Sequence, residues 1–378
     1  MKIFSFIRGF VIFLVSCSLL LATPNQCRRN VHAFFYLWYD IPNDTGFGNG
    51  TYKHWNHEVL PHWGGEEVNK LYPSVGTRHE PEKNLLHSPF FPLGGPYSST
   101  DRNTIRRQLQ ELEETGIEVI VVSWWGQESK SYATDTQGVN TDQSVSVLLQ
   151  VASEMVEEKG ACSIKIAFHL EPYPSRSVES VREDVEYIID RYSNLSAFYR
   201  DKETNKPLFY VYDSYHISSI EWRRLLTPGA KGSISIRGHP QYDGLFIGLW
   251  LEGHHGIDLV SGGFDGVYTY FASDGFSYGS TMENWSRICS FCRTAKKLCS
   301  LSVGPGYVDT AIRPWNAHNS KERRCIYDYN IYFSWVVLLV VAVSGCCCSS
   351  SSSDSTSGSG GSCNSSSGGV LVSSGTSR

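Results

Sequence analysis

Acidic side chains stand at the ends of several apolar segments of this chain, where they could do chemistry together. Glu171 and Asp213 each close such a segment, and Glu252 directly follows another. His169 lies two residues before Glu171, so the two side chains face the same way along an extended strand. Hydrolysis of a glycosidic bond usually needs two carboxylates, one for the leaving group and one that attacks or activates water. Glu171 is the first candidate because His169 accompanies it; the alternative is that these acids only hydrogen-bond loop amides and orient their neighbours.

Aromatic residues gather at similar positions. The chain holds 10 Trp and 21 Tyr. Trp124 and Trp125 end one apolar segment, and Tyr212 and Tyr270 lie near the ends of two others. Aromatic rings pack on the apolar faces of sugars, and tyrosine hydroxyls bond sugar hydroxyls. The composition is therefore typical of a sugar site, although a large barrel also uses many aromatic residues in its core.

The elements that must position these residues alternate between apolar strands and amphipathic helices. We expect strands at residues 31–39, 118–125, 164–171, 207–213, 242–251, 264–271 and 299–304. We expect helices at residues 101–115, 142–159, 178–192, 219–226, 254–261 and 282–297. Nearly continuous apolar strands that alternate with helices indicate a parallel sheet.

The predicted fold class is α/β, a (β/α)8 TIM-type barrel over residues 31–319 that lacks its eighth strand and last helices. In such a barrel the chemistry lies at the carboxyl ends of the strands, so the acids and aromatics above would meet there. Residues 40–97, the long segment after the first strand, would lie over that end. A doubly wound open sheet is the alternative, but no Gly-rich phosphate loop follows the first strand.

Charge and cysteine spacing argue against two classes of partner. The net charge is −5 with no long basic run, which excludes a nucleic-acid partner. Cys289 and Cys292 lie inside a helical pattern with no second pair or His at metal-ligand spacing, so packed or disulfide-linked thiols are favoured over a metal site. We expect no metal and no cofactor, and the sequence does not indicate an oligomeric state.

The N-terminus carries a targeting signal. Residues 1–22 combine Lys2 and Arg8 with a long apolar run, which predicts a signal peptide or a signal anchor. A membrane attachment through this end therefore remains open beside cleavage. Asn-x-Ser/Thr triplets at Asn43, Asn49, Asn194 and Asn284 agree with entry into the secretory pathway.

The C-terminal residues 325–378 differ in kind from the rest. A β-branched apolar run at residues 331–343 is followed by three Cys and then by mixed Ser and Gly. This composition predicts a disordered, low-complexity tail, such as a gene-model error would produce; a membrane anchor is the alternative. A seven-stranded barrel would have two unpaired edges prone to aggregation, and the run at 331–343 could cover the gap.

Several long motifs resemble those of the glycoprotein endo-α-1,2-mannosidase family. They are VHAFFYLWY at residues 31–39, KHWNH at 53–57, FHLEPY at 168–173, FYVYDSY at 209–215, YDGLFI at 242–247, FDGVYTYF at 264–271, SVGPGY at 302–307 and IRPWN at 312–316. The resemblance covers roughly residues 31–319 and keeps the motifs in order.

The resemblance implies a (β/α)8 barrel that cleaves an internal α-1,2-mannosidic bond with retention of configuration. The implied partner is an N-linked high-mannose glycan, and the implied place is the Golgi lumen or, through a type II anchor, the Golgi membrane. Cleavage of the leader would instead give a secreted protein. By the same resemblance the sugar site would be lined by Tyr36, Tyr39, His54, Trp55, Trp124, Trp125, Glu171, Tyr270, Arg313 and Trp315; the strand-end pattern adds His169, Tyr212, Asp213 and Glu252.

One departure from the family concerns catalysis. The family's two working glutamates lie in a Glu-Trp-His-Glu motif, which this sequence does not contain. Glu221 and Trp222 are followed by two Arg inside a predicted helix and are no substitute. We therefore expect a chain with no catalytic pair. The alternatives are a glycan-binding protein without catalysis, a membrane-tethered protein, and an enzyme that uses Glu171 with Asp213 or Glu252.

Overall fold

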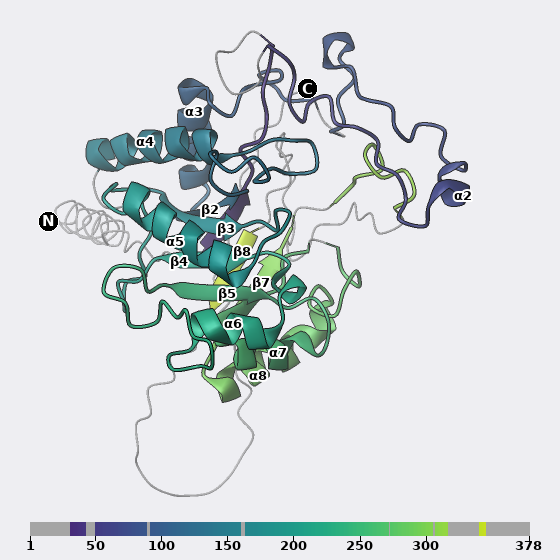
Figure 1. The fold of residues 1–378 in the computed structure, drawn as a ribbon. Helices are drawn as coiled ribbons and strands as arrows, with labels where there is room; N and C mark the ends of the chain where they lie inside the picture. Colours follow the sequence, from purple (N-terminus) through teal and green to yellow (C-terminus); the bar gives the residue numbers. More distant parts are fainter. Residues whose placement is uncertain are drawn as a thin grey trace, which may run out of the picture.

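The computed structural model describes residues 31–42, 50–88, 91–159, 163–271, 273–304, 307–316 and, for the backbone, 340–344. Their strands form a closed barrel with the helices around its outside (Figure 1). The predicted signal segment and most of the predicted tail lie outside the described residues. None of the helices within the described ranges is long and apolar enough to span a bilayer.

Seven parallel strands form most of the barrel wall, as the sequence predicts. They are β1 Val31–Phe35, β2 Val119–Trp124, β3 Lys165–Leu170, β4 Leu208–Val211, β5 Leu245–Leu249, β6 Gly266–Tyr268 and β7 Leu298–Val303. Each strand pairs in parallel with the next. Most strands are shorter than predicted at one or both ends, whereas β7 has its predicted length and begins one residue earlier.

The predicted helices are confirmed between these strands. They are α3 Arg102–Glu114, α4 Asp142–Lys159, α5 Val178–Tyr192, α6 Ser219–Leu226, α7 His255–Gly262 and α8 Trp285–Ala295. Short turns of helix lie at α2 Glu66–Asn69, η1 Pro81–Lys83, η2 Ser214–His216 and η3 Met282–Asn284. Side-chain caps fix two of the helix starts. The Asp101 carboxylate accepts from the first backbone N–H groups of α3, and Ser177 forms a capping box with Ser180 at α5.

An antiparallel strand occupies the place of the parallel eighth strand. This strand, β8 Val340–Ser344, pairs with β1 on one side and with β7 on the other. The parallel eighth strand of the family barrel is thus missing, as expected, and β8 overlaps the end of the run at 331–343 that could cover the gap. The edges of β1 and β7 are therefore paired at these residues. The physical reason is that Val-rich segments favour extended backbone, and two open edges offer a full set of hydrogen-bond partners.

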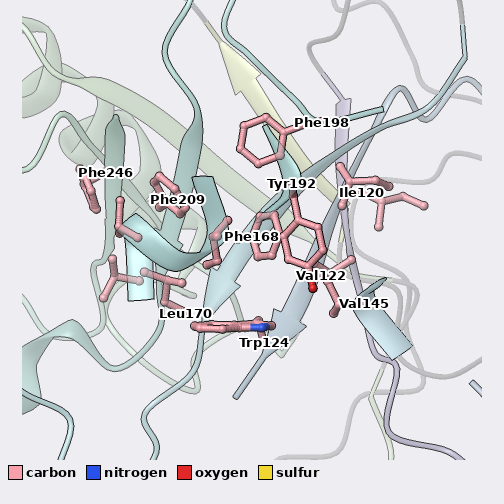
Figure 2. Close-up of a cluster of buried hydrophobic side chains, with 14 of the residues drawn as sticks. Ile120, Val122, Trp124, Val145, Phe168, Leu170, Tyr192, Phe198, Phe209 and Phe246 are labelled. Atoms are coloured by element: carbon pink, nitrogen blue, oxygen red, sulfur yellow. The ribbon is translucent and has the colours of Figure 1, made fainter. Parts of the chain in front are cut away.

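The strands separate two buried clusters, because alternate residues point to opposite faces of the sheet. The outer cluster lies between the strands and the helices and includes Val122, Trp124 and Phe168 (Figure 2). The inner cluster fills the barrel and includes Tyr210 and Tyr268. The outer cluster is mainly aliphatic and aromatic, whereas tyrosines and histidines enter the inner one.

The cysteines near α8 are structural, as predicted. A disulfide joins Cys289 of α8 to Cys299 of β7. Cys292, one turn further along α8, is a buried free thiol, and burial raises its pKa to about 11. No group of three or more His, Cys, Asp or Glu within the described ranges is arranged to hold a metal ion.

Candidate functional site

A chain of hydrogen bonds runs across the carboxyl ends of β2, β3 and β6. The Glu171 Oε1 atom accepts from Ser123 Oγ at 2.7 Å and lies 2.9 Å from His169 Nδ1. The other ring nitrogen of His169, Nε2, lies 2.8 Å from the Tyr268 hydroxyl. His169 is 0% exposed and Glu171 is 4% exposed. The sequence pattern predicted that His169 and Glu171 share a face, and the structure confirms it.

Tyrosine rings surround this histidine and carboxylate. The Tyr36 and Tyr270 hydroxyls hydrogen-bond to each other. The His169 ring stacks on the Tyr270 ring with centroids 5.4 Å apart. The centroid of the Tyr212 ring lies 4.7 Å from that of the Tyr270 ring. Burial raises the pKa of Tyr36, Tyr212, Tyr268 and Tyr270 well above the ordinary value. These phenols therefore stay neutral and keep their protons as hydrogen-bond donors.

Asp213 lies beside this cluster on a strained turn. Its backbone adopts the left-handed conformation, with φ 45° and ψ 44°, two residues after the end of β4. Burial raises the pKa of its carboxyl, and the nearby charge of Glu171 acts in the same direction. A carboxyl with a raised pKa can hold a proton for a leaving group.

Arg176 is a residue of this region that sequence reasoning missed. Its guanidinium donates to the backbone carbonyls of Leu170 at 3.2 Å, Tyr212 at 2.8 Å and Asp213 at 2.8 Å. It therefore joins the carboxyl ends of β3 and β4. Burial lowers its pKa, while the charges of Asp213 and Glu171 oppose that change. A basic residue in the loop directly after FHLEPY was the available signal.

The long first loop adds a second aromatic stack. Trp38 stacks between Tyr36, with centroids 4.6 Å apart, and His54, at 4.5 Å. The His54 Nε2 atom lies 2.5 Å from the Asp135 carboxylate, which accepts two backbone N–H groups from its own loop. The loop after β1 is thereby tied to the loop after β2. His54, predicted as a site residue, joins the cluster at its edge.

Two further predicted residues of this loop lie beneath its surface. Tyr39 and Trp55 are each 1% exposed and pack against each other with centroids 4.3 Å apart. The Trp55 indole N–H donates to the Tyr97 carbonyl at 2.8 Å. The structure therefore makes them the packed base of the loop rather than rings that face a ligand.

Histidines crowd the same loop. The His57 ring lies 5.3 Å from that of His54 and 5.7 Å from that of His87. Burial lowers the pKa of His57 to about 4 and that of His87 to about 3, and neighbouring histidines contribute to both shifts. Both rings are therefore neutral near pH 7, which permits the crowding.

The two adjacent tryptophans at the end of β2 differ in burial. Trp124 is 0% exposed, donates its indole N–H to Asp142 at 3.0 Å and faces the helices (Figure 2). The structure thus places Trp124 away from the inner cluster, because it alternates with Ser123. Trp125 follows the end of β2 and is half-buried, and its buried Nε1–H has no acceptor within the described ranges.

The remaining predicted residues lie around the rim. Glu252 is exposed, its backbone N–H donates to His255 Nδ1, and its charge reaches Tyr215. Arg313 binds Asp309 with 3.1 Å between Nη1 and Oδ2. The Trp315 indole N–H donates to the Leu60 carbonyl at 3.3 Å. Arg313 and Trp315 thus lie in the segment after β7, against the first loop.

Comparison with known proteins agrees with this arrangement. The profile of Glycosyl hydrolase family 99 matches residues 27–341. The chain is 43% identical over 296 residues to "Glycoprotein endo-alpha-1,2-mannosidase" of Rattus norvegicus, which covers 78% of this chain and 59% of the relative. It is 42% identical over 297 residues to "Glycoprotein endo-alpha-1,2-mannosidase-like protein" of Homo sapiens, which covers 78% of this chain and 60% of the relative. The chain thus spans about three-fifths of the length of these curated relatives.

A solved structure also resembles this fold. The GH99 endo-alpha-mannosidase from Bacteroides thetaiotaomicron superposes with a TM-score of 0.65 at 38% sequence identity, and the match covers 77% of this chain and 76% of that one. The barrel, the order of the motifs and these similarities agree. The chain belongs to glycosyl hydrolase family 99.

Proposed function

We propose that this chain binds an α-mannose-containing N-linked glycan at the carboxyl end of its barrel, in the secretory pathway. The observation that carries the proposal is the buried Glu171 carboxylate, which accepts from the Ser123 hydroxyl and lies 2.9 Å from His169 Nδ1. Two tyrosines adjoin His169: the Tyr268 hydroxyl bonds its other ring nitrogen, and the Tyr270 ring stacks on it. Neutral phenols and a fixed carboxylate supply donors and an acceptor for sugar hydroxyls. The names of the mannosidase relatives give the sugar class.

We further propose that this chain binds the glycan without cleaving it. Oε1 of Glu171 already accepts from two neighbours, which fits a carboxylate that holds the site together. The Glu-Trp-His-Glu sequence of the family is not present in these 378 residues. Binding without turnover follows if that motif carries the catalytic pair.

A second candidate is an enzyme that uses Glu171 with Asp213. The observation in its favour is the raised pKa of Asp213, which burial and the charge of Glu171 produce. A general acid must hold a proton, and burial shifts the pKa of Asp213 in that direction. Asp213 is the partner proposed here because its carboxyl lies within electrostatic range of Glu171, whereas Glu252 is exposed.

The test is calorimetric titration of the full chain with an α-1,2-linked oligomannoside, together with chromatographic analysis of products. We expect saturable binding and no released sugar. Glu171→Gln should weaken binding by about tenfold or more, as the loss of a charged hydrogen-bond acceptor would. Glu203→Gln, an exposed position before β4, is the matched control and should change the Kd less than about twofold.

Other results would decide against this reading. If the wild-type chain shows no heat of binding, the binding proposal is wrong. If it releases sugar, and both Glu171→Gln and Asp213→Asn abolish the release, the second candidate replaces it.

A further inference from the structure

Trp63, in the long first loop, is an unusual surface residue. Its side chain is 81% exposed, although tryptophan is among the residues that gain most from burial. The ring is nevertheless held on two sides. It packs on His62 with centroids 4.4 Å apart and meets Trp315 edge-to-face, also at 4.4 Å. An exposed ring held by two others keeps an apolar face open for a ligand.

Hydrogen bonds fix the backbone under this pair of tryptophans. The Leu60 N–H donates to the Ile312 carbonyl at 2.8 Å, and the Trp315 indole returns a bond to the Leu60 carbonyl at 3.3 Å. The His62 N–H donates to the Asn69 side chain at 2.7 Å. The two segments that carry the rings are therefore joined before any ligand arrives, which lowers the entropy lost on binding.

Polar donors border the open face of Trp63. The His62 Nδ1 atom accepts from the Gly64 N–H at 2.8 Å, so the neutral ring carries its proton on Nε2. That Nε2–H and the exposed Trp63 indole N–H can donate to hydroxyl groups. An apolar face with hydroxyl-binding donors at its edge fits a hexopyranose ring better than a purely apolar partner.

The same segment connects this surface to the inner cluster. Tyr307, at its start, lies within electrostatic range of Tyr36. The Tyr307 hydroxyl donates to Asp309 at 2.7 Å, and Asn316 donates to the other oxygen of Asp309 at 2.8 Å. Trp315 lies at the far end of this hydrogen-bonded segment. A glycan longer than one or two sugars could follow it from the cluster to Trp63.

We propose that Trp63 and Trp315 form a second sugar subsite, which stacks a hexose of the glycan distant from the one bound near Glu171. This inference rests on the proposed function for its choice of sugar. It predicts that binding depends on the length of the sugar. Short oligomannosides reach only the cluster around Glu171, and longer ones also reach Trp63.

The experiment is titration of the full chain with α-linked mannobiose and with a longer branched oligomannoside. The indole N–H signals are followed by 1H–15N NMR, with the Trp63 signal identified by Trp63→Phe. We expect the Trp63 signal to shift only with the longer sugar. Trp63→Ala should lower the affinity for the longer sugar by about fivefold, a typical contribution of an aromatic ring. It should lower the affinity for mannobiose by less than about twofold. Trp63→Phe should restore most of the affinity, and Leu71→Ala, also in this loop and 73% exposed, is the control.

Each contrary result separates the two proposals. A Trp63 signal that stays fixed under the longer sugar overturns the subsite, whether or not Glu171→Gln weakens binding. Equal loss for both sugars in Trp63→Ala also overturns it, because the residue would then support the whole fold. A shift of the Trp63 signal with protein concentration alone would assign the surface to a second copy of the chain instead. If Trp63 shifts while Glu171→Gln has no effect, the subsite stands and the proposed cluster site fails.

Discussion

The two faces of the barrel wall are built by the same strands but carry different chemistry. The outer face presents Val122, Phe168 and Phe209 to the helices, where apolar burial stabilises the fold (Figure 2). The inner face presents His169 and Tyr268, whose polar atoms bond to each other inside the barrel. Buried polar groups persist only when they are hydrogen-bonded.

The difference teaches where function can reside in this chain. The outer face has few groups that a polar ligand could use. The inner face holds donors and acceptors already arranged, and the first loop extends it with buried histidines. Stability and recognition are thus separated by one sheet, and each can be perturbed alone.

The largest expected effect is on the outer face. Phe168→Ala should lower the free energy of unfolding by about 3–5 kcal/mol, because it removes a side chain that is 1% exposed and leaves a cavity. Urea denaturation measures the loss, with the half-exposed Phe276→Ala as control. Glycan affinity of the molecules that remain folded should not change. A fall in that affinity of more than about threefold would show that glycan binding also depends on the packing of the outer face.

Acid should weaken the loop rather than the outer face. His57 has a pKa of about 4 in the folded chain, against an ordinary value near 6.5. The unfolded chain therefore takes up a proton below pH 6.5 while the folded chain resists until about pH 4, so stability falls as the pH drops through that window. At pH 5 this costs about 2 kcal/mol.

The comparison that isolates this effect is urea unfolding at pH 7 and pH 5 for the wild type and for His57→Gln. The variant should lose about 2 kcal/mol less on acidification. His254→Gln, at an exposed position, should behave as the wild type does. If the free energy of unfolding falls equally from pH 7 to pH 5 in all three proteins, His57 is not the cause of the acid sensitivity.

A smaller effect is expected from a single inner hydroxyl. Tyr270→Phe removes the partner of the Tyr36 hydroxyl and should lower the free energy of unfolding by about 1 kcal/mol. It should also weaken glycan binding, because the hydroxyl lies among the proposed sugar donors. The control is Tyr132→Phe, whose ring is 41% exposed. Unchanged glycan binding in Tyr270→Phe would show that the sugar does not contact the Tyr270 hydroxyl.

The smallest effect should come from the solvent side of the helices. Arg106 pairs with Glu154 at 3.1 Å and Glu158 at 2.7 Å, but all three side chains are partly exposed. Arg106→Ala should change the free energy of unfolding by less than about 0.5 kcal/mol, since water and salt screen such pairs. Thermal unfolding at low and high salt measures it. A larger, salt-sensitive loss would mean that the helix layer also depends on charge.

Much of the fold could be predicted because apolar periodicity determines which segments become strands and helices. The parallel strands and the helices between them lie where the pattern places them. The alternation rule also grouped His169 with Glu171. Applied to β2, the same rule places Trp124 outside, where the structure has it, whereas the resemblance to the family implied a place in the sugar site.

Other parts of the site required contacts between distant segments. Sequence spacing did not show that Tyr39 and Trp55 pack beneath the loop, or that Arg176 binds the carbonyls at the ends of two strands. Glu252 follows an apolar segment as Asp213 ends one, yet Glu252 is exposed and Asp213 is not. Periodicity reports the side of an element and not the direction of the turn that follows it.

The sequence by itself determined the class of fold, the order of its elements and the pairing of a histidine with an acid at the end of one strand. These depend on local spacing, which a chain carries in its own residues. Only the tertiary structure decided that β8 closes the barrel in the antiparallel direction and that Trp63 meets Trp315. Both depend on segments far apart in the chain, whose contacts are fixed by the free energy of the whole packed molecule.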